Sequence, residues 1–222
     1  MKKLLADALF KFSLGFLMVF GLVFIPSGSI KYINGWLFMA SMFLPILIIG
    51  IVLLFRDPAL LKKRLNGKEK ARSQDIIVKL SGLVFITSFI TSALDYHLRL
   101  TYIPFALSVF FSGTLLISYI IYFLVLRENR YLSRIIEVQN GQKVIDTGLY
   151  SIIRHPMYSA TTLMFLSITL VLGSVMGFSI MLLYPVLISK RIKGEEEFLS
   201  QNLDGYDEYM KKVKYRLIPL IW

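Results

Sequence analysis

One apolar block of the chain reads MYSATTLMFLSITLVLGSVMGFSIMLLYPVLIS and covers Met157–Ser189. A transmembrane helix needs about 20 apolar residues, so this block is too long for a single crossing. Gly173-Ser174 and Gly177 lie near its middle, and such residues favour turns between periodic segments. The block therefore predicts a tight helical hairpin.

Four further apolar spans precede the hairpin, and each is long enough to cross a bilayer as a helix. The 222-residue chain is 56% hydrophobic with a mean hydropathy of +0.66, which is far more apolar than a soluble domain. We expect an all-α integral membrane bundle of about five to six transmembrane helices, ending in the hairpin. The four spans are Leu9–Ile25, Trp36–Phe55, Ile76–Leu94 and Pro104–Leu126.

The connections between the spans carry turn and charge signals. Ser27-Gly28-Ser29 and Asn34-Gly35 mark the first turn, and Asp57-Pro58 ends the second span. A basic loop follows over residues 56–75. Its charge run favours a solvated loop that faces lipid headgroups, with a partner site as the alternative. No small-residue cleavage pattern follows the first span, so we do not expect it to be a signal peptide.

The basic residues are distributed very unevenly between the two ends of the predicted bundle. Of the 25 Lys and Arg residues, 22 lie in the N-terminal segment, in the stretches 56–72 and 127–154, and in the tail from residue 190. Cytoplasmic loops of membrane proteins carry such an excess. We therefore expect a multi-pass protein with both termini and the 127–154 loop facing the cytoplasm, and a membrane-lipid partner. The net charge of +11 then reflects topology, and we expect no nucleic-acid partner.

The chain has no cysteine and two histidines, His97 and His155. Disulfides, thiol catalysis and cysteine-ligated metals are therefore excluded. A metal site built from histidines is not expected either.

The segment before the hairpin reads GLYSIIRHPMY and covers Gly148–Tyr158. Polar groups this close to a bilayer are expensive unless they find partners or have a function. His155 precedes a proline, which moves it out of the helical region, and Pro156 suits the first turn of the next helix. His155 thus sits at a helix start, either as a hydrogen-bonded structural residue or as a functional one. Tyr150 and Tyr158 alone would be typical of the interfacial aromatic belt.

The segment after the hairpin contains Arg191 and the run Glu195-Glu196-Glu197. Arg191 and Glu195 are four residues apart, so an exposed helical salt bridge is one interpretation. Three acids in a basic tail, near a helix C-terminus that disfavours them, argue for a functional role, and on these residues alone the two interpretations are balanced. Further along, Tyr206, Tyr209 and Tyr215 fit an amphipathic helix on the membrane interface. On the opposite side of the membrane, we expect the Asp95–Arg99 segment to cap a loop.

These motifs, taken in order, resemble those of the isoprenylcysteine carboxyl methyltransferases and their phospholipid methyltransferase relatives. The shared pattern is Gly-x-Tyr, Arg-His-Pro-x-Tyr, an apolar hairpin and Glu-Glu-x-x-Leu, which here are Gly148–Tyr150, Arg154–Tyr158, Met157–Ser189 and Glu195–Leu199. The resemblance covers about residues 138–222, and Ala160 stands where the family usually has glycine. It implies transfer of a methyl group from S-adenosylmethionine inside the membrane, most directly to the carboxylate of an isoprenylcysteine-like lipidic or prenylated acceptor.

The resemblance also implies roles for individual residues. Arg191 would meet the methyl acceptor as the catalytic residue, and no metal would take part. The residues implied to bind the cofactor, in a pocket on the cytoplasmic side, are Gln139, the strand-like Gln142, Lys143, Val144 and Ile145, then Tyr150, His155, Pro156, Met157, Tyr158 and Glu195. The roles of the tail residues Glu208, Lys212 and Arg216 do not follow from the resemblance.

The expected organisation is two parts. Residues 1–130 hold four transmembrane helices with the cytoplasmic loop 56–75, and residues 131–222 hold a methyltransferase-like catalytic region of cofactor loop, hairpin and cytoplasmic tail. Neither the oligomeric state nor a full crossing by the hairpin follows from the sequence.

Other functions remain open on the residues alone. A phospholipid amine acceptor would need a base, for which Glu196 and His155 are the candidates. An NADPH-dependent membrane reductase of the sterol type carries a similar Arg-His-Pro-x-Tyr ending. A small transporter or membrane scaffold is the non-enzyme alternative, and it predicts charged or broken helices at mid-membrane.

Overall fold

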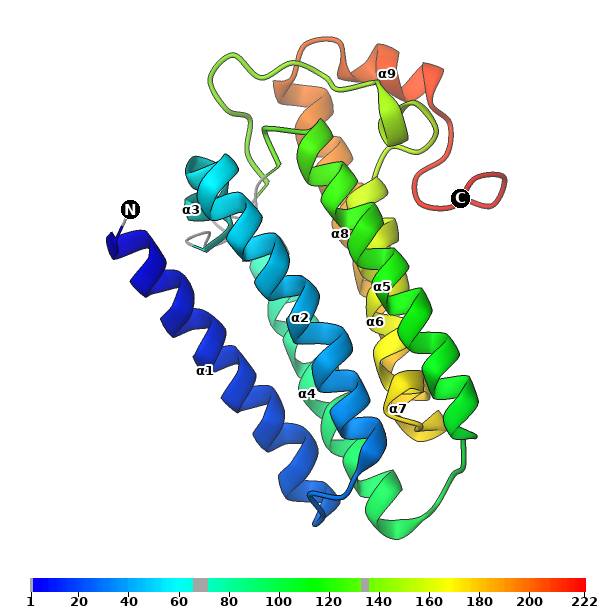
Figure 1. Ribbon diagram of the computed structural model, residues 1–222. Helices are drawn as coiled ribbons and strands as arrows, with labels where there is room; N and C mark the ends of the chain where they lie inside the picture. Colours follow the sequence, from blue (N-terminus) through cyan, green and yellow to red (C-terminus); the bar gives the residue numbers. More distant parts are fainter. Residues whose placement is uncertain (1, 66–71, 133–135) are drawn as a thin grey trace.

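The computed structural model describes residues 2–65, 72–132 and 136–222, with the side chains of Lys63 and of residues 72–74 excepted. The described chain is all-helical, as predicted, and has no strand in these ranges. Figure 1 shows long helices packed side by side in an elongated bundle. The helices are α1 (Lys2–Ser27), α2 (Ile33–Arg56), α3 (Pro58–Leu65), α4 (Arg72–Leu98), α5 (Phe105–Glu128), α6 (Pro156–Val171), α7 (Val175–Met181), α8 (Leu183–Asn202) and α9 (Tyr206–Lys212).

Within the described residues, five helical segments are long and apolar enough to cross a membrane: α1, α2, α4, α5 and α7 together with α8. The shorter α6 is a further apolar helix. This confirms the predicted fold class of an integral membrane bundle. The bundle buries a core of aromatic and branched side chains that include Phe24, Phe38 and Leu115, while many large apolar side chains on α1, α2 and α4 stay exposed, as expected of surfaces that face lipid.

The hairpin predicted from Met157–Ser189 is confirmed. It turns at Gly173, whose φ of 79° lies in the left-handed region that glycine adopts without strain. Ser174 caps α7, because its hydroxyl accepts a hydrogen bond from the Gly177 amide at 2.9 Å. The Ser174 hydroxyl also donates to Asp95 at 2.5 Å, and Asp95 accepts from the Thr101 amide at 2.7 Å. The expectation that the Asp95 segment caps a loop is therefore correct.

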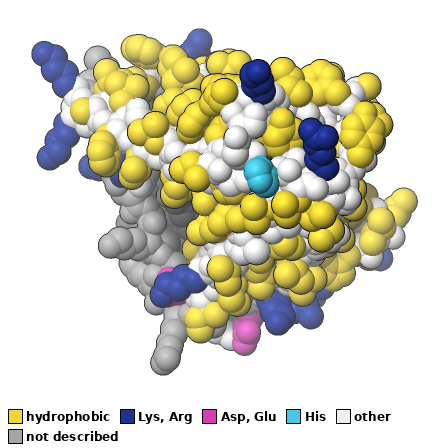
Figure 2. All heavy atoms as spheres, turned by 90° about the horizontal axis from the view of Figure 1, so that it is seen from below, with side chains coloured by type: hydrophobic (Ala, Val, Ile, Leu, Met, Phe, Trp, Pro, Cys, Tyr) yellow, Lys and Arg dark blue, Asp and Glu magenta, His cyan; other side chains and the backbone are white. Residues whose placement is uncertain are grey.

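The basic segments gather at one end of the bundle. Figure 1 shows the N-terminus, α3 and α9 at the same end, while the α1–α2, α4–α5 and α6–α7 connections lie at the other. Figure 2 views this second end, where hydrophobic side chains predominate and few Lys or Arg side chains are visible. The segments that hold most of the Lys and Arg residues thus lie at one end of the bundle, and the segments with few of them lie at the other.

Three local expectations are wrong. The stretch after Asp57 is helical over Pro58–Leu65 rather than a loop. Pro58 suits the first turn of a helix, and the Asp57 side chain accepts a hydrogen bond from the Leu60 amide at 3.0 Å. The lysines at 68 and 70 lie outside the described residues. The segment 142–145 is irregular and pairs with no strand in the described part of the chain. The tail does not form one amphipathic interfacial helix. Instead Tyr206 and Tyr209 are buried, and Tyr215 lies beyond the end of α9.

Candidate active site

The Arg154-His155-Pro156 segment is held by the tail. Ile153 and Tyr215 form an isolated parallel bridge. The Arg154 amide donates to the Tyr215 carbonyl at 2.9 Å, and the His155 amide donates to the Arg216 carbonyl at 2.9 Å. His155 is the N-cap of α6 with φ −126°, and Pro156 is in the first turn, as the sequence predicts. The tail therefore fixes the start of α6 by backbone hydrogen bonds.

Glu196 ties these two segments to α8. Its Oε1 accepts from Nε of Arg154 at 2.7 Å and contacts Nε2 of His155 at 3.2 Å, while its Oε2 accepts from Nε of Arg216 at 2.7 Å. Arg154 and His155 are buried together with Glu196. Arg154 also donates to the carbonyls of Val213 and Lys214 at 2.7 and 3.0 Å. The structure thus places these four side chains in one cluster, the fastening cluster, which joins the start of α6, α8 and the tail.

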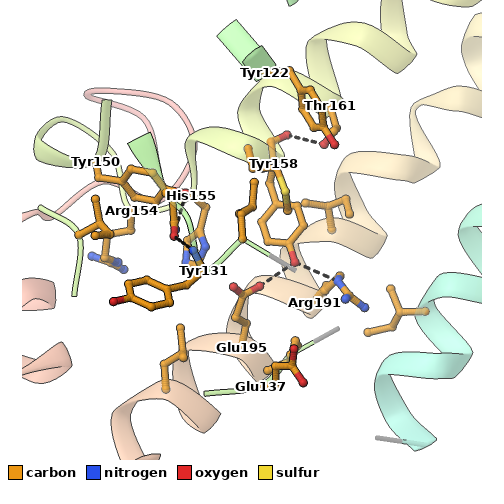
Figure 3. Close-up of a pocket in the computed structure, with 18 of the residues that line it drawn as sticks. Tyr122, Tyr131, Glu137, Tyr150, Arg154, His155, Tyr158, Thr161, Arg191 and Glu195 are labelled. Carbon is orange, nitrogen blue, oxygen red and sulfur yellow. Dashed lines mark hydrogen bonds between the residues drawn. The ribbon is translucent and has the colours of Figure 1, made fainter. Parts of the chain in front are cut away.

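A second cluster joins α6 to α8. The buried Tyr158 hydroxyl donates to Oε2 of Glu195 at 2.6 Å and accepts from Nε of Arg191 at 2.9 Å. Figure 3 shows this hydroxyl between the two side chains. Arg191 and Glu195 therefore both bind the Tyr158 hydroxyl. The interpretation of the two residues as an exposed helical salt bridge does not account for this third side chain. Arg191 is buried, and Glu195 is half-buried.

The second cluster borders a cavity of about 590 Å³, a size typical of small-molecule sites. The structure brings ten of the sequence-predicted site residues to its lining: Gln142, Lys143, Val144, Ile145, Tyr150, His155, Met157, Tyr158, Arg191 and Glu195. Gln139 and Pro156 are not in the lining. Gln139 instead braces the loop, since its side chain donates to the Tyr131 carbonyl at 2.7 Å, and Pro156 is buried in the first turn of α6.

Residues 101–204 match the model of a family described as phospholipid methyltransferase. This region belongs to the phospholipid methyltransferase family. It extends from the residues just before α5 through α8, so it contains the Arg154–Tyr158 motif, Arg191 and Glu195. Members are membrane methyltransferases that normally use S-adenosylmethionine, which favours methyl transfer over the reductase and transporter alternatives. No curated protein sequence matches the chain.

The pocket also takes residues that sequence reasoning missed. They come from four places: the end of α3, the first half of α4, the end of α5, and the loop after it. They include Arg64, Ser81, Gly82, Phe85, Tyr122, Asn129, Tyr131 and Glu137. The one sequence signal was the helical spacing of Val78, Gly82 and Phe85, which places them on one face of α4, but nothing in the sequence says what that face borders.

Tyrosines close the pocket on the tail side. The Tyr209 hydroxyl donates to the Tyr150 carbonyl at 2.8 Å, and Asn129 donates to the Tyr150 hydroxyl at 3.0 Å. Burial raises the pKa of the Tyr150, Tyr206 and Tyr209 hydroxyls above their usual range, so they stay neutral at physiological pH. Nearby, a hydrogen bond from Lys212 lowers the pKa of the exposed Asp146, which ties α9 to the loop.

The charged groups at the pocket are mixed in sign. Glu137 and Glu195 are carboxylates in the lining, and Arg64, Lys143, Arg154 and Arg191 are cations. Within the described ranges, no group of three or more His, Asp or Glu side chains is arranged to hold a metal ion.

Proposed function

We propose that this membrane methyltransferase uses S-adenosylmethionine to O-methylate the carboxylate of an isoprenylcysteine-like lipidic acceptor. The observation that carries the proposal is the Tyr158 hydroxyl, which contacts both Arg191 and Glu195 at the wall of one cavity. It links a cation suited to the acceptor with a carboxylate suited to the cofactor.

The pocket residues fit the cofactor in size and charge. A cavity of about 590 Å³ is large enough for a nucleoside with an amino-acid chain. Glu195 and Glu137 offer carboxylates to hydroxyl, amino and ammonium groups, which are hydrogen-bond donors. Gln142–Ile145, Tyr150, Met157 and Tyr158 form the surrounding wall. When bound, S-adenosylmethionine supplies a methyl group on a positively charged sulfur.

Arg191 is the proposed partner of the acceptor. Its guanidinium can bind a carboxylate through two parallel hydrogen bonds, and its burial strengthens such a pair relative to one in water. A carboxylate is already a nucleophile at neutral pH, so the protein has no proton to remove. The contribution of the site is alignment, which supplies several kcal/mol of barrier reduction when reacting groups are held in register.

The fastening cluster around Glu196 is proposed to keep that alignment. It joins α8, which carries Arg191 and Glu195, to the start of α6, which carries Tyr158. Because Glu196 directly follows Glu195, a shift of Glu196 moves the cofactor-facing carboxylate with it. We also propose that the end of the bundle with the basic segments and the pocket faces the cytoplasm, where soluble cofactor is available.

N-methylation of a phospholipid amine is the second candidate. The specific observation in its favour is that two carboxylates, Glu137 and Glu195, line the same cavity and can accept the proton that an amine must lose. The family match includes phospholipid methyltransferases by description.

The test is methyl transfer from radiolabelled S-adenosylmethionine by the protein in nanodiscs. Acceptors are an S-prenylated cysteine with a free carboxylate, its carboxamide, and phosphatidylethanolamine. We expect label in the free acid and none in the carboxamide. Label in phosphatidylethanolamine alone would replace the proposal by the amine alternative, and label in no acceptor would contradict both.

A further inference from the structure

The pocket continues from the polar cluster into an apolar channel between α4, α6 and α8. On α8, Tyr184, Ile188 and Arg191 all line the cavity, and their spacing places them on one face. Seven residues separate Tyr184 from Arg191, which corresponds to about 10 Å along a helix. The channel therefore extends about that far from the acceptor-binding arginine into the membrane part of the bundle.

An aromatic group closes the inner end of this channel. The rings of Phe85 and Phe165 meet edge to face at 4.3 Å, and those of Phe165 and Tyr184 at 4.7 Å. Phe85 also contacts Tyr184, with ring centroids 5.7 Å apart. All three residues line the cavity. The channel thus has a charged mouth at Arg191 and an apolar floor. The mouth suits the charged head group of a ligand, and the floor suits its apolar chain.

Gly82 lies in the α4 wall of the cavity, about one helical turn before Phe85. It lines the cavity, and a Cβ placed on it would meet no atom within 4 Å. This differs from Gly177, where a Cβ would meet the Ser92 hydroxyl at 2.0 Å, so that close helix packing requires glycine there. Packing does not require glycine at Gly82, and its missing side chain leaves open space beside the cavity.

We propose that this channel holds the apolar chain of the acceptor and that Gly82 sets how wide a chain it admits. The inference rests on the proposed function for the identity of the head group. Gly82 is then a specificity-determining residue, because a branched prenyl chain passes this point only while α4 has no side chain there. A larger residue at this position narrows the channel without touching Tyr158, Arg191 or Glu195.

The experiment compares Gly82→Leu with a matched control, Gly50→Leu. Gly50 is also a helical glycine whose Cβ would meet nothing within 4 Å, but it lies on α2 and outside the cavity lining. Both changes replace a poor helix former with a good one, so effects on folding have the same sign. The measurements are equilibrium binding of radiolabelled N-acetyl-S-farnesylcysteine and calorimetric binding of S-adenosylmethionine, both in nanodiscs.

We expect Gly82→Leu to weaken binding of the farnesyl ligand at least tenfold, to leave S-adenosylmethionine affinity within about twofold, and to spare a short S-methyl analogue. Gly50→Leu should match the wild type in all three. Equal farnesyl binding by both variants would overturn the channel assignment and leave the proposed function standing. Absence of S-adenosylmethionine binding in the wild type would overturn the proposed function, whereas the farnesyl comparison would still decide the role of Gly82.

Discussion

The Tyr158 hydroxyl donates a hydrogen bond to Oε2 of Glu195 over 2.6 Å, although 37 positions separate the two residues in the sequence. The same hydroxyl accepts from Arg191. The hairpin makes this possible, because α8 runs back along α6 and returns to the level at which α6 begins (Figure 1). One oxygen therefore sits between the residue proposed for the acceptor and the residue proposed for the cofactor.

Tyr158→Phe tests this link. It removes the shared oxygen and keeps the ring, which packs in a buried cluster with Ile188 and Ile192. A hydrogen bond to a charged group contributes about 1.5–3 kcal/mol, so kcat/KM should fall by about tenfold to a hundredfold while the protein stays folded. The check is initial-rate kinetics together with the melting temperature in detergent. Wild-type kinetics in this variant would show that the link is not used.

Glu196→Ala should destabilise the protein far more than Glu197→Ala. Glu196 is the shared partner of Arg154, His155 and Arg216, so its loss leaves a buried arginine uncompensated. Breaking a buried pair in this way costs about 3–5 kcal/mol. Glu197 is exposed, and its loss should be nearly neutral. Thermal unfolding in detergent gives the comparison, and equal melting temperatures would contradict the fastening role.

Arg191→Lys separates charge from geometry at the acceptor site. Lysine keeps the positive charge but loses the planar fork that binds a carboxylate with two hydrogen bonds. We expect turnover to fall at least tenfold at saturating S-adenosylmethionine, with cofactor affinity changed much less. Rates and calorimetry on the same preparation measure the two effects. If the variant lost cofactor affinity but kept turnover, Arg191 would be assigned to cofactor binding instead of acceptor binding.

The tail tyrosines predict sensitivity to alkali. Burial raises the pKa of Tyr206 and Tyr209 above the unfolded value of about 10. The folded state then holds these protons more tightly, so their stabilising contribution is complete below about pH 10 and is lost as pH rises further. Tyr209→Phe should flatten this alkaline loss in a series of melting temperatures. An unchanged pH profile would show that Tyr209 does not titrate in the transition.

The sequence supports prediction of the fold better than of the pocket. Apolar length and glycine position predict the spans and the hairpin, because crossing a bilayer imposes those lengths on any helix. The sequence motifs also predict Tyr158, Arg191 and Glu195 as site residues, and the structure brings them together. Their arrangement around one hydroxyl was not predictable, since it depends on how α6 and α8 pack.

The missed parts depend on contacts between distant segments. Glu195 and Glu196 are neighbours on α8 with the same chemistry, and helix geometry points them in different directions. The packing of α8 against α6 and the tail then decides that Glu195 meets Tyr158 and that Glu196 meets Arg154. The sequence predicts Tyr209 on the membrane interface, whereas the structure buries it against the protein. The helical spacing of apolar residues is the same for a face that packs on lipid and a face that packs on protein. The helical spacing of Gly82 with Val78 and Phe85 places all three on one face of α4, but the sequence does not show that this face borders a cavity.

The most direct test of the central claim is calorimetric titration of S-adenosylmethionine into three proteins in nanodiscs: the wild type, Glu195→Gln and Glu197→Gln. Both substitutions remove one carboxylate charge from α8, at positions two residues apart, but only Glu195 lines the cavity. We predict binding by the wild type and by Glu197→Gln with similar affinity, and binding at least tenfold weaker by Glu195→Gln. No binding by the wild type, or equal affinity in all three proteins, would contradict the assignment of this pocket to the cofactor.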